Sequence, residues 1–200
     1  MNNFVVVIDT QYDFMMEDGL LYVDGAQSLI VPLTKYLAAL DPKETLGVLF
    51  TFDTHTRETY EGSPESKLFP LHCELGTKGH KNVLNPHVLN FEYFEMHKPV
   101  FDMWAEEASS EHLWACGGMP TYQNANDFFM ERNPTIDVVD IVGVALNFCV
   151  KQAADGFIER GFTVRLHPDL TCGIDTGKPG DLDARVLYAD EIAQGKVIIA

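Results

Sequence analysis

The chain has 200 residues, of which 46% are hydrophobic and 22% are charged, a composition that can bury a core and excludes wholesale disorder. Its formal net charge of −16 argues against nucleic acid or an anionic membrane surface as a partner, because both attract clustered Lys and Arg. There is no signal-peptide pattern and no apolar run as long as a membrane span, so we expect a cytoplasmic protein with one domain over residues 1–200.

Apolar runs rich in β-branched residues recur along the chain and predict the strands of a sheet. Their continuous apolarity is typical of parallel strands that are covered on both faces. Amphipathic segments between the runs predict helices. Because the two kinds of segment alternate, we expect an α/β fold with a mostly parallel sheet. The predicted strands are residues 4–9, 46–52, 93–98, 138–144, 163–167 and 196–199, and the predicted helices are residues 27–40, 147–160 and 182–194.

Three residues that could carry chemistry stand at the ends of predicted strands. Asp9 ends the first strand, Lys98 ends the third, and Cys149 lies in the first turn of the helix after the fourth. A helix start lowers the pKa of a thiol and offers N–H groups to an oxyanion. Asp9 could exchange the thiol proton while Lys98 stabilises the thiolate. The alternatives are core packing for the cysteine and turn or surface roles for the other two residues.

A second polar group follows the second predicted strand. Asp53 and His55 alternate along an extended stretch, so their side chains point the same way, and His72 follows in a long segment rich in Gly, Pro and His. One carboxylate and two imidazoles are a frequent ligand set for a divalent metal ion, and Zn²⁺, Fe²⁺ and Mn²⁺ all suit it. The alternative is a polar turn with incidental histidines.

Taken together, these pieces resemble the isochorismatase-like cysteine hydrolases, and within them the nicotinamidase/pyrazinamidase branch. Each piece is unspecific alone, but all of them occur in the family's order. They are residues 7–14 (VIDTQYDF), 53–55 (DTH), 69–79 (FPLHCELGTKG), Lys98 and residues 143–150 (GVALNFCV).

The resemblance implies a three-layer α/β/α fold with a six-stranded, mostly parallel sheet. It implies a catalytic triad of Asp9, Lys98 and Cys149 that hydrolyses nicotinamide, or a pyrazinamide-like aromatic carboxamide, through a thioester, as in NAD salvage. It also implies one divalent metal ion, with zinc the first choice. Its ligands would be Asp53, His55, His72 and a carboxylate for which Glu65 is placed.

The resemblance implies further features around the nucleophile. The bond between Val144 and Ala145 would be cis and would aim N–H groups at the oxyanion. Aromatic side chains would hold a planar substrate, and Phe14, Phe69 and Trp104 are the candidates.

The chain also departs from the family pattern. Leu146 and Asn147 stand where Thr and Asp are usual, Pro99 follows the lysine, and residues 99–133 form a long segment. Related reactions therefore remain alternatives, namely hydrolysis of a ureido or carbamoyl amide or of isochorismate, as does a non-catalytic binding protein on the same fold. The sequence does not specify the metal ion, and it leaves a homo-oligomer open.

Overall fold

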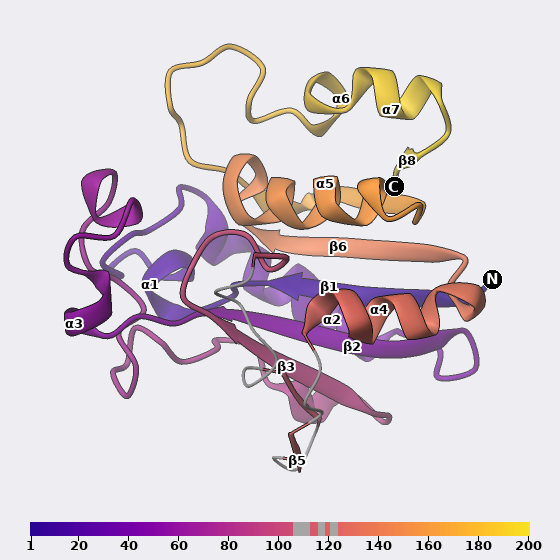
Figure 1. The fold of residues 1–200 in the computed structure, drawn as a ribbon, viewed down its shortest axis with the longest axis horizontal. Helices are drawn as coiled ribbons and strands as arrows, with labels where there is room; N and C mark the ends of the chain where they lie inside the picture. The colour runs from indigo at the N-terminus through magenta and orange to yellow at the C-terminus, as the bar shows by residue number, and fades with distance from the viewer. Residues whose placement is uncertain (106–112, 116–118, 121–123) are drawn as a thin grey trace.

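The computed structural model describes residues 1–105, 113–115, 119–120 and 124–200, and these form a three-layer α/β/α arrangement (Figure 1). Its centre is a sheet of eight strands in the order β5-β4-β3-β2-β1-β6-β7-β8. The strands are β1 (Asn3–Ile8), β2 (Thr45–Asp53), β3 (Tyr93–Lys98), β4 (Leu113–Ala115), β5 (Met119–Pro120), β6 (Val138–Val144), β7 (Val164–Cys172) and β8 (Val197–Ile199).

The sheet is parallel except at one edge. The six runs predicted as strands became β1, β2, β3, β6, β7 and β8, and every pairing among these is parallel. β4 and β5 add two antiparallel strands beyond β3, so the expected count of six strands was wrong. These two strands have three and two residues, too few to form a recognisable pattern in the sequence.

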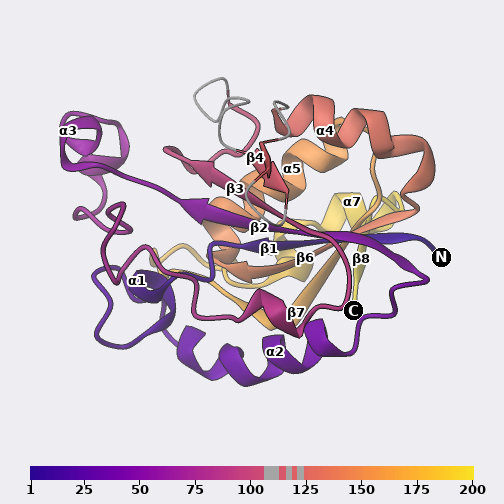
Figure 2. The same cartoon turned by 90° about the horizontal axis from the view of Figure 1, so that it is seen from below.

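Helices cover both faces of the sheet, with α2 on one side and α4 and α5 on the other (Figure 2). Each face carries a hydrophobic core, because successive side chains of the buried strands point to opposite faces. Phe4, Val6 and Ile8 of β1 face the core beneath α4 and α5, whereas Val5 and Val7 face the core beneath α2. The helices of these layers are α2 (Ile30–Ala38), α4 (Ala125–Arg132), α5 (Lys151–Glu159), α6 (Ala184–Leu187) and α7 (Ala189–Ala193).

All three predicted helices are composite, and the segment predicted at 147–160 starts in a π-helical turn, Leu146–Val150, before α5. The segment predicted at 27–40 begins with a 3₁₀ turn, Ala26–Leu29, before α2, and the segment at 182–194 is divided at Tyr188 into α6 and α7. Short helices lie in the connections: α1 (Tyr12–Met15), α3 (Arg57–Tyr60) and 3₁₀ turns at Glu65–Lys67, Pro86–Val88 and Asn133–Thr135. No helix among the described residues has both the length and the apolar character that a membrane span requires.

The pairing of β1, β2, β3 and β6 fixes the edge at which the polar residues meet. Asp53, the last residue of β2, is paired with Lys98, the last residue of β3, and Ile8 of β1 is paired with Gly143 of β6. Parallel strands end at the same edge, so this register places Asp9, Asp53 and Lys98 side by side. The edge lies on the side of α1 and α3 in Figure 1.

Candidate active site and metal centre

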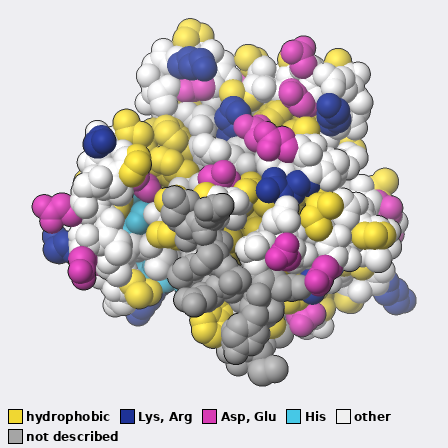
Figure 3. All heavy atoms as spheres, in the orientation of Figure 1, with side chains coloured by type: hydrophobic (Ala, Val, Ile, Leu, Met, Phe, Trp, Pro, Cys, Tyr) yellow, Lys and Arg dark blue, Asp and Glu magenta, His cyan; other side chains and the backbone are white. Residues whose placement is uncertain are grey.

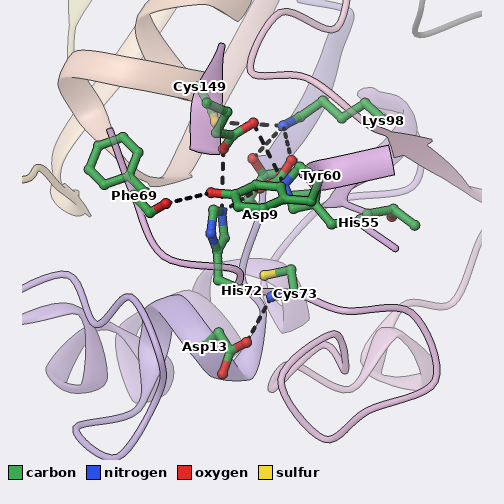
Figure 4. A network of polar contacts seen from close by, with 12 residues as sticks. Asp9, Asp13, His55, Tyr60, Phe69, His72, Cys73, Lys98 and Cys149 are labelled. Atoms are coloured by element: carbon green, nitrogen blue, oxygen red, sulfur yellow. Dashed lines mark hydrogen bonds and ion pairs between the residues drawn. The ribbon is translucent and has the colours of Figure 1, made fainter. Parts of the chain in front are cut away.

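Asp9, Lys98 and Cys149 converge at the carboxyl edge of the sheet (Figure 4). The ammonium Nζ of Lys98 lies 2.8 Å from Oδ2 of Asp9 and 3.5 Å from Sγ of Cys149. All three side chains are buried, with exposed fractions of 0%, 1% and 5% for Asp9, Lys98 and Cys149. The residues proposed from their strand-end positions therefore share one site, although they lie far apart in the sequence.

The burial of this group favours a protonated cysteine in the resting protein. Burial raises the pKa of the Cys149 thiol well above its usual value, and a hydrogen bond with Asp9 adds to this, while Lys98 opposes it. Burial opposes the charge on Lys98, but the carboxylates of Asp9 and Asp53 outweigh it and raise the lysine pKa. The expectation that the helix start lowers the thiol pKa is wrong for this state, because burial dominates.

Asp9 is held in one orientation by its own backbone and by Thr51 of β2. Its φ of 46° lies in the left-handed region, which non-glycine residues rarely occupy. The hydroxyl of Thr51 donates to Oδ1 of Asp9 at 2.6 Å, and the N–H of Asp9 donates to the same hydroxyl oxygen. Oδ2 is thereby directed to Lys98.

Cys149 lies on a tight turn between β6 and α5. Residues Leu146–Val150 form a π-helical turn, and Phe148 departs from helical geometry with φ −125° and ψ −106°. Such turns are frequent at functional sites. The peptide bond between Val144 and Ala145 is cis, at the position that the family resemblance singled out.

Asp53, His55, Glu65 and His72 form a compact group beside the triad, and one donor atom from each lies within 4.8 Å of the others. Nε2 of His55 and Nε2 of His72 lie 3.0 and 2.9 Å from Oδ2 of Asp53. The same two atoms lie 3.6 and 3.4 Å from the carboxylate of Glu65. Two imidazoles and two carboxylates thus point at one small volume.

The electrostatics of this group suit a bound cation. Burial opposes charge on the imidazoles, but hydrogen bonds to Asp53 outweigh it and raise the pKa of His55 to about 9 and of His72 to about 10. Both carboxylate oxygens of Glu65 are buried without a hydrogen-bond partner among the described residues. Because a buried carboxylate needs compensation, these residues fit a divalent metal ion with nitrogen and oxygen ligands.

Lys98 joins the two groups. Its Nζ lies 3.6 Å from Oδ1 of Asp53 as well as 2.8 Å from Asp9. Burial would raise the pKa of Asp53, but Lys98 and the two histidines outweigh it and hold that pKa below its usual range. The group of Asp9, Lys98 and Cys149 and the candidate metal-binding group of Asp53, His55, Glu65 and His72 therefore form one charged network.

Three supporting residues were missed in the sequence. The side-chain amide of Gln11 makes two hydrogen bonds with the backbone of Asp53. Its Nε2 donates to the C=O at 2.8 Å, and its Oε1 accepts from the N–H at 2.7 Å. Asp13 accepts from the N–H of Cys73, the residue after His72, at 2.7 Å. The hydroxyl of Tyr60 donates to the carbonyl oxygens of Phe69 and Pro70. Gln11 and Asp13 lie within the VIDTQYDF motif, so that motif could have identified them as residues that support the site.

The aromatic candidates fall into two environments. Phe14 packs against the ring of His72, with centroids 5.2 Å apart, and Phe69 contacts Phe101 and Phe148, so both lie beside the site. Trp104 lies in another cluster, where its ring packs on Phe129 and Phe157 and its Nε1 donates to the carbonyl of Ala153. The structure therefore does not bring Trp104 together with the other two rings.

Residues 3–181 match the model of the isochorismatase domain family. The chain belongs to the isochorismatase family. It is also 27% identical over 176 residues to a nicotinamidase/pyrazinamidase of Mycobacterium tuberculosis (strain ATCC 25618 / H37Rv), a match that covers 85% of this chain and 86% of that relative.

Solved structures of this family share the fold along the whole chain. A nicotinamidase/pyrazinamidase from Bacillus subtilis superposes with a TM-score of 0.73 at 20% identity and covers 100% of both chains. A pyrazinamidase of Pyrococcus horikoshii in complex with zinc gives a TM-score of 0.68 at 25% identity, over 100% of this chain and 99% of that one.

Proposed function

We propose that this protein is a metal-dependent cysteine amidase that hydrolyses nicotinamide, or a similar aromatic carboxamide, to the acid and ammonia. The observation that carries the proposal is the contact of Lys98 with both Asp9 and Cys149, next to four buried metal-ligand side chains. The similarity to nicotinamidases supports the choice of substrate.

Cys149 is the nucleophile in this proposal. Its thiol passes a proton to Asp9, and Sγ forms a bond to the carboxamide carbon while the C=O electrons move to oxygen. The C–N bond then breaks, and Asp9 returns the proton to the departing nitrogen, so that ammonia leaves a thioester on Cys149. Asp9 next takes a proton from water, the hydroxyl oxygen attacks the thioester carbon, and the acid departs as the thiol is restored.

The other residues of the site hold charge and position. Lys98 stabilises the thiolate during the attack, and the N–H groups of Ala145 and Cys149 receive the oxyanion. Phe14 and Phe69 hold the planar ring. Asp53, His55, Glu65 and His72 would hold the metal ion, which when bound would supply a Lewis acid beside the substrate ring.

Replacing Cys149 with Ala tests the proposal. We expect C149A to fold normally and to release no ammonia from nicotinamide or pyrazinamide. The matched control is C172A, since Cys172 is a free, partly exposed thiol outside the site, and this variant should retain full activity. Equal ammonia release by C149A and the native protein would refute the cysteine mechanism.

A substrate panel separates the related reactions. Ammonia release from nicotinamide, pyrazinamide and ureido compounds, each with and without chelator, should be greatest for the aromatic carboxamides and should fall with chelator. Metal binding itself can be measured by titrating zinc against a chromophoric chelator. E65Q should bind zinc about 10- to 100-fold more weakly than the native protein, because it loses an anionic ligand. Unchanged zinc affinity in E65Q would remove Glu65 from the ligand set.

A further inference from the structure

A pocket opens beside the metal-binding group and lies outside the triad. Its volume is about 280 Å³, near the lower end of ligand pockets, so it suits a small group. It lies between the segment after α3, with Pro64 and Leu68, and the segment after β3, with Pro99, Val100 and Phe101. The face drawn in Figure 3 carries a group of hydrophobic side chains on the side where α3 lies in Figure 1.

The position of this pocket connects it to the reaction site. One wall is Glu65 of the metal-binding group, another is Pro99, which follows Lys98, and a third is Gln152, which lies one turn of helix after Cys149. Phe101, also in the wall, packs against Phe69 and Phe148 with ring centroids 6.0 and 5.8 Å apart. A substrate whose ring lies beside Phe69 would therefore have this pocket next to it.

The pocket wall selects the chemistry of the group that it can bind. Leu68, Val100 and Phe101 offer apolar surface, and the side chain of Leu68 is 66% exposed, so it is accessible to an apolar group. None of the ten described residues that line the pocket is Lys or Arg, so an anionic group would find no cationic partner there. Burial of an apolar group against this wall would be favourable.

We propose that this pocket binds a neutral, apolar substituent carried on the aromatic ring of the amide, so that the preferred substrates are alkyl-substituted aromatic carboxamides. The inference rests on the proposed amidase function and deepens it. The reacting carboxamide stays at Cys149, and the substituent extends from the ring into the space between Leu68 and Phe101. Bare nicotinamide leaves the pocket empty and is the poorer substrate.

The test is the ratio of kcat/KM for alkylated nicotinamides to kcat/KM for nicotinamide. Methyl, ethyl and propyl groups are placed at each free ring carbon in turn, and a matched set carries them on the amide nitrogen. At one ring carbon we expect kcat/KM to rise about threefold for each methylene that enters the pocket. L68D should reduce this gain while leaving kcat/KM for nicotinamide close to native. V31D is the control, because Val31 is 61% exposed and lies on α2, away from the pocket.

The outcomes distinguish this inference from the proposed function. Turnover of nicotinamide with no gain at any ring carbon would overturn the inference and leave the amidase function standing. A gain confined to amides alkylated on nitrogen would also overturn it, because the pocket would then receive the leaving group. No turnover of any amide by the native protein would overturn both. A gain of the same size in L68D and V31D would place the substituent elsewhere.

Discussion

Two polar clusters in this protein are both built around buried aspartates and differ in how the aspartate charges are compensated. In the strand-end cluster (Asp9, Asp53, Lys98 and Cys149), one ammonium serves two carboxylates and a thiol. In the Asp140 cluster (Asn3, Asp140, Arg165 and His167), one carboxylate in the middle of β6 receives donors from three side chains. In the first cluster the thiol can exchange a proton with a carboxylate, whereas in the second cluster the oxygens of Asp140 already accept hydrogen bonds from three side chains.

The comparison separates reactivity from stability. Donors from His167, Arg165 and Asn3 outweigh the burial of Asp140 and lower its pKa to about 2, so the carboxylate stays charged throughout the neutral range. The charged and hydrogen-bonded carboxylate of Asp140 is therefore not available to accept a proton in the neutral range. At the strand ends, a protonated thiol lies within reach of a carboxylate that can accept its proton. We therefore expect substitutions in the two clusters to affect different measurements.

The largest effect should follow the loss of proton transfer in the strand-end cluster. D9N keeps the shape of the side chain but removes the base, so kcat should fall about 10²- to 10⁴-fold. Ammonia release from nicotinamide, measured at a temperature where the variant is folded, reports the loss. Asp24 is exposed, so D24N serves as the control and should keep native activity. A D9N variant with more than a tenth of native kcat would contradict the assigned role.

A substitution at Gly143 should disturb the backbone that positions the strand-end cluster. Gly143 has φ 107°, and a Cβ there would lie 2.2 Å from the carbonyl oxygen of Ile8, next to Asp9. We expect G143A to cost about 2–4 kcal/mol of unfolding free energy, from strain and overpacking together, and to lower activity as well. Denaturant unfolding measures the first and ammonia release the second.

Gly195 provides the matched control for that substitution. It also has a positive φ, 71°, but a Cβ there would meet no atom within 4 Å. G195A should therefore lose only the backbone contribution, about 1 kcal/mol, and keep native activity. Equal losses in the two variants would show that the contact with β1 does not matter.

The Asp140 cluster should respond in stability alone. D140N removes the charge that holds Arg165 and His167, and we expect a loss of about 2 kcal/mol at neutral pH with native kcat. Because the folded pKa of Asp140, about 2, lies below the unfolded value of 3.8, its contribution is present above pH 4 and disappears as pH falls towards 2. The difference between D140N and native protein should therefore shrink in denaturant titrations at pH 3.

The outcome at neutral pH is checked against a surface substitution. Asp190 is exposed on α7, and D190N should change stability by less than about 0.5 kcal/mol. A gap between D140N and native protein that stays constant from pH 7 to pH 3 would rule out titration of Asp140 as its cause.

The smallest effect should come from Tyr60, which supports the strand-end cluster from outside. Y60F removes two hydrogen bonds to the carbonyls of Phe69 and Pro70, each 3.0 Å long. We expect a loss of about 1 kcal/mol in stability and a few-fold rise in KM with kcat unchanged, because Phe69 would be held less firmly. A fall in kcat with native KM would instead indicate a part in the chemical step.

The sequence predicted the parallel sheet and the residues of the strand-end cluster because both are written in local patterns. Six apolar runs became the six parallel strands, and polar residues at the ends of parallel strands necessarily meet at one edge. Tyr188 shows where such patterns stop: the apolar spacing continues across it, while the helix ends and begins again.

Other features depend on contacts that no local pattern contains. The raised pKa of Cys149 follows from its burial, and burial is a property of the folded chain. The hydrogen bond from the N–H of Cys73 to the carboxylate of Asp13 joins residues 60 positions apart. Trp104 was expected near the mouth of the site from the family resemblance, but its indole N–H donates to the carbonyl of Ala153 in α5.

The pairing of Asp53 with Lys98 has a consequence for how this site can change. Backbone hydrogen bonds between β2 and β3 set the distance between Asp53 and Lys98, and this distance can change only in steps of one residue. Lys98 in turn contacts Asp9 and Cys149, so the register links the Asp53, His55, Glu65 and His72 group to those two residues. Replacing single side chains can weaken either group but leaves this spacing alone. Inserting one residue into β3 would turn Lys98 to the opposite face of the sheet and disconnect both groups in one step.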